Sequence, residues 1–243
     1  MKLMMAMVLG CATQATQDGA AKAKAAIQKV ADSGSYKVKF TATVTTPGSD
    51  PVVHEGETVR VKGGVLFIYA KASGGAEKRI VRVGNKVWVY HEVAEDWVDA
   101  AENAAAGAGR GVQNPDEVLD IISKHLEKAT LSADGNTVNL KVDGGDIEKI
   151  MKEQTNQGAM NYKESSAEIG LALDGSGRVA KFSCAAHLAS TDPALKGKKV
   201  EYVASVEVQS YDQEKELKFT TKKGTEIPLN KEVAEAVKKA TTK

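Results

Sequence analysis

The side chains that could do chemistry in this chain of 243 residues are few, and their spacing does not match a reaction centre. The run His91-Glu92-Val93-Ala94-Glu95 has glutamate where a zinc-binding helix needs its second histidine, and its surroundings are strand-like. The glycine-rich run 107–111 lacks the lysine and hydroxyl residue that end a phosphate-binding loop. No serine, cysteine or aspartate stands beside a base in a nucleophile arrangement. We therefore expect no enzyme, no metal site and no cofactor.

The first of the two cysteines suggests a covalent modification. Cys11 follows Met1-Lys2, an apolar run over 3–9 and Gly10, which is the order of a secretory signal. Val8-Leu9-Gly10-Cys11 resembles the bacterial lipobox, whose cysteine becomes the lipid-modified first residue of the mature chain. This resemblance predicts a signal segment at 1–10, lipidation of Cys11 and a tether over 11–19. The alternative is an ordinary N-terminus with a chance cysteine.

A lipid on Cys11 would place the protein in the bacterial cell envelope. No other run approaches the roughly 20 apolar residues that span a bilayer, so we expect an anchored protein that faces the periplasm. Ala12 after the cysteine resembles lipoproteins released to the outer membrane rather than those retained in the inner one. The second cysteine, Cys184, lies in a β-like run, where an unreactive buried thiol is the expected state.

Composition and charge limit the classes of binding partner that we expect. Lys and Arg total 33 against 32 Asp and Glu, and aromatic residues make up 5% of the chain. A balanced charge with few aromatic residues favours neither phosphate-backbone binding nor base stacking, so we expect no nucleic-acid partner. We expect lipid or lipoprotein acyl chains, the membrane itself and an envelope protein as partners.

Most of the chain alternates between apolar and polar residues, which is typical of strands with one buried face. The clearest case is 36–45, where Tyr, Val, Phe, Ala and Val alternate with Lys and Thr. A helix over 20–32 precedes it, Asn114-Pro115 opens a helix that runs to about 128, a short one covers 146–154, and Asn230 caps a last one through 239. Further strands are predicted at about 53–62, 65–71, 77–83, 86–93, 96–100, 129–133, 137–142, 166–174, 177–190, 199–210 and 214–221.

Short glycine turns between these strands make neighbours antiparallel. The pattern therefore predicts an α+β fold, with a broad curved antiparallel sheet and helices on one side.

The order of elements adds a family resemblance. After the lipobox and the Ala-rich helix come the strand 36–45, the run 56–62, Gly84-Asn85-Lys86-Val87-Trp88-Val89-Tyr90 and the hairpin 169–179. Together they resemble the LolA/LolB-like lipoprotein-carrier superfamily, which includes LppX and LprG lipoproteins. The resemblance implies a single domain over 20–243. It also implies an unclosed β-barrel, or half-barrel, with helices on its concave side and an apolar cavity that takes acyl chains.

Such a carrier needs a continuous apolar lining, because each methylene moved out of water contributes roughly 0.8 kcal/mol. We expect a lipid-anchored envelope lipoprotein that binds or carries acyl chains. Two alternatives stay open: an envelope sensor or scaffold with a filled core and, less favoured, an envelope hydrolase. For any single candidate residue, a place in an ordinary core is the competing interpretation. The candidate lining residues are Phe40, Val44, Val59, Phe67, Trp88, Tyr90 and Phe182.

Overall fold

The computed structural model describes residues 18–75, 77–101, 119, 120, 122–153, 160–191, 193–195 and 197–242, without the side chains of 149–153 and 160. The predicted signal segment, Cys11, most of the tether and the glycine-rich run 107–111 lie outside these residues.

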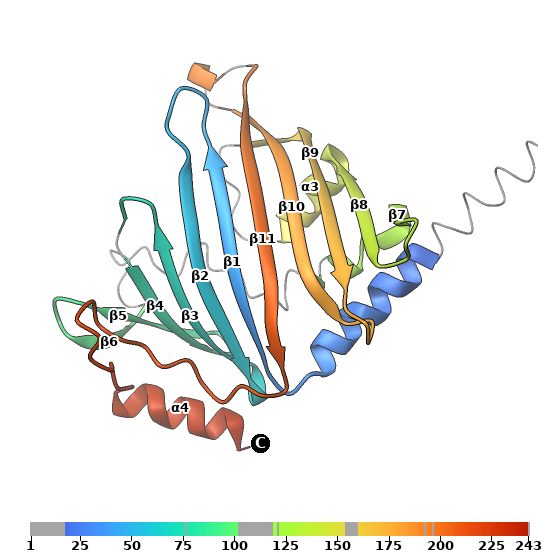
Figure 1. Cartoon of the computed structure of the whole chain (residues 1–243). Coiled ribbons are helices and arrows are strands. Elements are labelled where there is room, and N and C mark those ends of the chain that lie inside the picture. The colour runs from blue at the N-terminus through green and yellow to red at the C-terminus, as the bar shows by residue number, and fades with distance from the viewer. Residues whose placement is uncertain are drawn as a thin grey trace, which may run out of the picture. The chain divides into compact units, whose positions relative to one another are not determined.

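Eleven strands form one antiparallel sheet with the order β6-β5-β4-β3-β2-β1-β11-β10-β9-β8-β7 (Figure 1). β6 and β7 are its two edges, so the sheet does not close within the described chain. The predicted α+β fold class, an unclosed antiparallel sheet with few helices, is confirmed. The strands are β1 (Tyr36–Thr45), β2 (Val52–Val61), β3 (Val65–Ala72), β4 (Glu77–Val83), β5 (Lys86–His91), β6 (Asp96–Asp99), β7 (Ala129–Leu131), β8 (Thr137–Asp143), β9 (Met160–Leu173), β10 (Val179–Ser190) and β11 (Lys199–Tyr211).

Glycine turns join many of these strands, as the sequence predicts. Gly84, between β4 and β5, has φ 58°, and Gly177, between β9 and β10, has φ 73°. Residues with a Cβ atom rarely adopt this left-handed conformation, so glycine permits the tight turn.

One predicted strand is wrong. Residues 214–221 make no ladder with the sheet, and their only bridge joins Thr220 to Glu226, five residues after the segment ends. Alternation alone predicted a strand there. The segment is extended, but its apolar side chains pack onto a face of the sheet instead of pairing at an edge.

Contacts between residues divide the chain into two compact units. The first unit consists of the described residues of Met1–Asp32, Ala42–Val52 and Pro115–Glu207, and the second of those of Ser33–Thr41, Val53–Asn114 and Val208–Lys243. A single domain over 20–243 stays a prediction.

In the first unit, helices cover one face of the sheet. The helix over 18–32 lies close to β7, because a Cβ atom on Gly19 would come within 2.8 Å of the Ala129 carbonyl oxygen. Lys22 and Lys29 donate to the carbonyl oxygens of Gly135 and Ser176 at 3.2 and 2.5 Å, which fixes the helix to two hairpin turns. The helix α3 (Gly144–Glu153) contacts β8 and β9 and lies behind them in Figure 1.

The C-terminal helix α4 (Lys231–Thr241) packs on the second unit, against β3, β4 and the short 3-10 helix Lys62–Gly64. Asn230 caps it, as predicted, by accepting a hydrogen bond from the Val233 amide at 3.1 Å. None of the helices within the described residues is long and apolar enough to cross a membrane.

Candidate functional site

The sheet of the first unit has one apolar face. Because directly paired residues of antiparallel strands point to the same side, its register defines three cross-strand rows on this face. The rows run across β8, β9, β10 and β11 and share apolar side chains. They are Val138-Leu171-Phe182-Val206, Leu140-Ile169-Cys184-Ala204 and Val142-Ala167-Ala186-Tyr202.

Burial falls along the first of these rows, whereas the other two rows also contain the buried Ala204 and Ala186 on β11 and β10. Val138 and Leu140 on β8 are buried, as is Leu171 on β9. On β10 and β11, Phe182, Cys184 and Tyr202 are only half-buried, although they lie on the same face. Within the described residues, the apolar sheet face of the first unit is therefore incompletely covered at Phe182, Cys184 and Tyr202.

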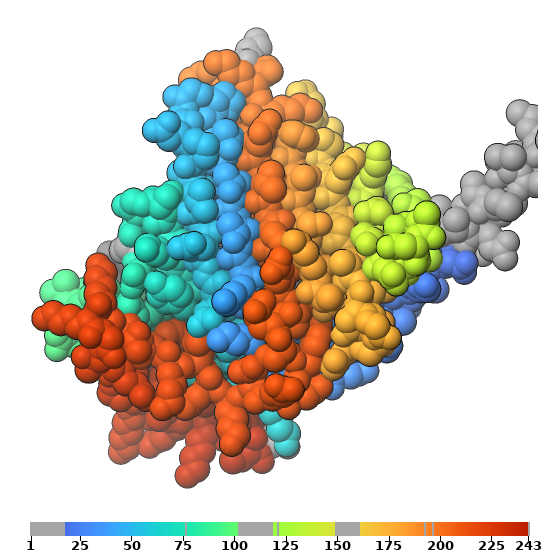
Figure 2. Space-filling model, viewed as in Figure 1, coloured from blue at the N-terminus to red at the C-terminus, as the bar shows by residue number. Residues whose placement is uncertain are grey.

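The opposite face of the same strands is polar and open. It carries exposed ion pairs, such as Lys141 with Glu168 at 3.3 Å and Lys181 with Glu207 at 3.0 Å. Figure 2 shows β9, β10 and β11 side by side, with no helix over them in this view. The sheet of the first unit thus has one apolar face and one solvated face, because successive side chains of a strand point to opposite sides.

Cys184 is the cysteine within the residues that the structure describes, and it lies on the apolar face. Burial raises the pKa of Cys184 to about 11, so it reacts slowly at neutral pH because little thiolate is present. Burial, and secondarily Cys184, also raises the pKa of Tyr202. Both groups are uncharged at neutral pH, which keeps this part of the face apolar.

Four of the seven predicted lining residues lie together in the second unit. Val59, Phe67 and Trp88 are each 1% exposed, and Tyr90 packs against the same cluster. Phe219 and Ile227 from the C-terminal segment and Val233 from α4 complete this cluster. In this structure the four residues therefore contact the protein's own chain, and any role as a ligand lining stays a proposal.

The other three predicted residues lie elsewhere. A Cβ atom on Gly56 would come within 2.6 Å of the Phe40 ring. Phe40 thus shares the side of β2 that Gly56 faces, opposite to Val59. Val44 is half-buried on β1, and Phe182 belongs to the rows of the first unit. The seven residues do not share one face of the sheet.

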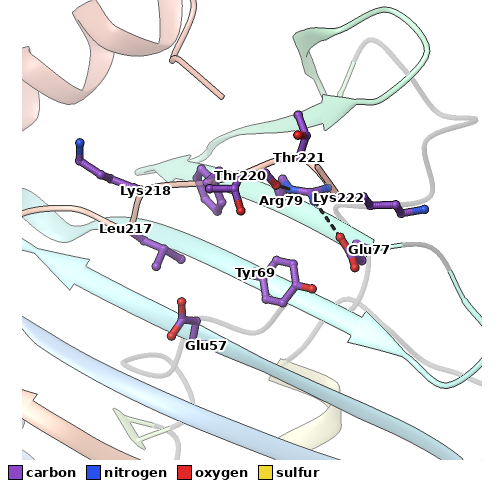
Figure 3. A pocket seen from close by; sticks show the side chains of 10 residues that line it. Glu57, Tyr69, Glu77, Arg79, Leu217, Lys218, Thr220, Thr221 and Lys222 are labelled. Carbon is purple, nitrogen blue, oxygen red and sulfur yellow. Dashed lines mark hydrogen bonds and ion pairs between the residues drawn. The ribbon is translucent and has the colours of Figure 1, made fainter. Parts of the chain in front are cut away.

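A polar pocket of about 330 Å³ lies in the second unit, between the strands β2 to β4 and the C-terminal segment (Figure 3). Its carboxylates, lysines and hydroxyl groups do not suit an acyl chain, which needs an apolar lining. Lys218 and Lys222 extend away from the pocket in Figure 3. The lining residues are Glu57, Tyr69, Glu77, Arg79, Leu217, Lys218, Phe219, Thr220, Thr221 and Lys222.

Arg79 is the buried charge at this pocket, with its side chain 3% exposed. Its Nη2 and Nη1 atoms donate to Glu77 at 2.7 Å and to Glu92 at 3.2 Å, and its Nε donates to the Thr220 carbonyl oxygen at 2.8 Å. The guanidinium carbon lies 5.8 Å from the centre of the Tyr69 ring. Burial, followed by the neighbouring Glu77, raises the pKa of Tyr69.

Sequence reasoning missed Arg79 and most of the half-buried apolar residues of the first unit. Arginine in an alternating strand is usually a solvated residue, so nothing in the sequence marked Arg79 as buried. The alternation over 166–188 and 199–211 did mark an apolar face. The register between β10 and β11 was the missing information.

The run His91 to Glu95 forms the end of β5 and the turn after it, not a helix. His91 Nδ1 accepts a hydrogen bond from the Ala94 amide at 3.2 Å, and the run is exposed.

Three solved structures similar to this chain are bacterial. LppX from Mycobacterium tuberculosis has a TM-score of 0.42 and 11% identity, over 82% of this chain and 97% of that chain. LprF from Mycobacterium bovis has a TM-score of 0.39 and 12% identity, over 84% of this chain and 94% of that chain. A LolA superfamily protein from Nitrosomonas europaea has a TM-score of 0.34 and 10% identity, over 83% of this chain and 95% of that chain. No protein-family model and no curated protein sequence matches the chain.

Proposed function

We propose that this protein is a lipid-anchored protein of the bacterial cell envelope that binds acyl chains, without catalysis, on the apolar face of its first unit. The supporting observation is the fall in burial along one cross-strand row, from the buried Val138 and Leu171 to the half-buried Phe182 and Val206. Removing such an apolar surface from water lowers the free energy, and the methylene groups of an acyl chain can cover it.

The magnitude favours a long chain. Each buried methylene contributes roughly 0.8 kcal/mol, so ten of them offset much of the translational and rotational freedom lost on binding. The row between the bulkier Phe182 and Tyr202 carries the small side chains of Cys184 and Ala204. The lipid on Cys11, which is also part of the proposal, would keep the protein beside a supply of acyl chains.

The Cys184 thiol offers a direct test, because Cys11 is the other cysteine in the chain. Alkylation by N-ethylmaleimide would be followed by mass spectrometry in the full chain with Cys11 acylated or replaced by serine. We expect palmitate, added below its micelle concentration, to slow alkylation of Cys184 severalfold and saturably. Unchanged alkylation at every palmitate concentration would contradict the proposal.

A matched pair of variants locates the site. Cys184→Phe adds bulk to the half-buried apolar face, whereas Ala185→Phe adds it to the exposed opposite face of the same strand. Binding of a fluorescent fatty acid should weaken about tenfold in Cys184→Phe, a loss equivalent to about two methylenes, and stay near wild type in Ala185→Phe. Equal loss in both variants would place the fatty acid elsewhere.

A second candidate, an envelope sensor or scaffold without a small-molecule ligand, has support from the second unit. There the predicted lining residues Val59, Phe67 and Trp88 are packed by the protein's own chain. This candidate predicts that palmitate fails to protect Cys184, so the same alkylation experiment separates the two functions.

A further inference from the structure

The C-terminal strap, defined here as residues 213–230, covers an apolar face of the second unit together with α4. Phe219 of the strap packs its ring 6.3 Å from Phe67 and 5.3 Å from Trp97, measured between ring centres. Ile227 and the helix residue Val233 are buried in the same cluster. Without the strap and α4, this face of the sheet would expose a second apolar surface.

The strap is joined to the sheet differently from the way strands are joined to each other. Its backbone–backbone hydrogen bonds are local, as between the Ile227 amide and the Phe219 carbonyl oxygen at 2.8 Å, and the Glu214 amide donates to the Ser35 hydroxyl at 3.0 Å. β3, in contrast, pairs with β2 over Val65–Ala72 and with β4 over Val65–Lys71. Removing the strap therefore breaks none of the ladder bonds described for these strands.

Side chains attach the strap to the sheet at separate points. The Arg79 guanidinium donates to the Thr220 carbonyl oxygen at 2.8 Å, and the Trp97 indole donates to that of Pro228 at 2.9 Å. Glu77 and Glu92 hold the buried Arg79 in place through two charge-assisted hydrogen bonds. Arg79 thus holds the strap against β4 through its hydrogen bond to Thr220, and we call it the latch.

We propose that the strap and α4 form one opening unit, which detaches while β2 to β5 stay folded, and that Arg79 is the latch that keeps it closed. Opening uncovers Val59, Phe67 and Trp97, a second apolar surface. Local opening of a segment with few ladder bonds is a general property of folded proteins.

Amide hydrogen exchange of the full wild-type chain at low denaturant tests the opening unit. We expect the amides of Ile227 and Ala234 to exchange faster, and with a smaller denaturant dependence, than those of Ile68 and Ile80. The Trp97 indole N–H should exchange with the strap amides, because its acceptor is in the strap. Equal rates with equal denaturant dependence for strap and strands would overturn the proposal.

Variants test the latch. Arg79→Gln should raise strap exchange about tenfold or more without changing the exchange of β3, because hydrogen bonds to charged groups are the stronger ones. Glu92→Gln is the milder variant, since it keeps the guanidinium and removes one carboxylate partner of Arg79, together with the exposed pair of Glu92 with Lys222 of the strap at 3.9 Å.

Lys218→Gln is the matched control. Its partner Glu226, at 3.2 Å, lies within the strap, so the exposed pair does not link strap to sheet. In the Lys218→Gln variant, amide exchange of the strap should change by about twofold at most. Arg79→Gln and Glu92→Gln variants with unchanged strap exchange, or with strap and β3 accelerated equally, would contradict the latch.

Discussion

The two units use the same alternating strands in different ways. In the first unit one face of the sheet is charged and the other apolar, and the apolar face is half-buried at Phe182 and Tyr202. In the second unit apolar residues occupy both faces, with Phe67 on one and Ile68 on the other, and both are buried.

The comparison shows that apolar strands alone do not make a binding surface. What matters is whether the chain supplies a cover of its own. The strap and α4 supply one over Phe67, whereas the described helices of the first unit leave Phe182, Cys184 and Tyr202 only half-buried. A surface for an exogenous acyl chain is therefore expected in the first unit.

The largest expected effect comes from the same substitution in both units. Phe67→Ala should lower the free energy of unfolding by about 3–5 kcal/mol, because a buried ring leaves a cavity. Phe182→Ala should cost only about 1–2 kcal/mol, since Phe182 is only half-buried. Urea denaturation followed by circular dichroism measures both, and equal costs would remove the contrast between the units.

Gly63→Ala tests how closely α4 is fitted to the second unit. Gly63 has φ 80°, and a Cβ atom there would come within 2.2 Å of the Ala240 carbonyl oxygen, so α4 would have to shift. We expect a loss of about 2 kcal/mol in thermal or urea unfolding. Gly175→Ala in the first unit is the control, because a Cβ atom there meets no other atom within 4 Å. A neutral Gly63→Ala would indicate that α4 is not held in this position.

Asn230 joins α4 to the edge strand β6, so its substitution tests the closure of the second unit. Its Oδ1 accepts from Val233, while its Nδ2 donates to Asp96 and to the Trp97 carbonyl oxygen at 3.0 and 3.2 Å. Asn230→Ala should cost about 1–2 kcal/mol. Asn230→Asp keeps the helix cap and loses the donor, so it should recover only part of this. Full recovery would limit the role of Asn230 to capping.

The smallest effect is a pH dependence in the first unit. Partial burial raises the pKa of Asp174, but hydrogen bonds from Ser176 and Arg178 outweigh it and lower the pKa to about 2. Because the folded-state pKa lies below the usual value, this contribution to stability is present above about pH 4 and is lost as the pH falls towards 2.

Asp174→Asn should therefore cost about 1 kcal/mol at neutral pH, and the difference from wild type should shrink between about pH 4 and pH 2. Urea unfolding at several pH values measures it. A difference that grows in acid would mean that the carboxylate is not stabilised in the folded state.

The sequence predicted the strands well where turns and alternation agree. Glycines such as Gly84 and Gly177 adopt the positive φ that short hairpins need, and Asn230 caps the last helix as expected. These signals are local, so they can be read without knowledge of the pairing.

The candidate lining was harder to predict. Alternation shows which residues of one strand share a face, but it does not show which face of the next strand lies on the same side of the sheet. Phe40 and Val59 are both apolar and both in β-strands, yet they face opposite sides. The strap was misread for a related reason, since 214–221 alternates like a strand and packs as a cover. Only the register and the tertiary packing distinguish these cases.

The most direct test of the contrast between the units is photo-crosslinking with a palmitate analogue that carries a diazirine on its chain, followed by peptide mass spectrometry. Our account predicts saturable adducts on β9, β10 and β11 of the first unit, above all near Phe182 and Tyr202, and none above background on β2 to β6. Adducts confined to the second unit, or the absence of saturable adducts, would contradict it.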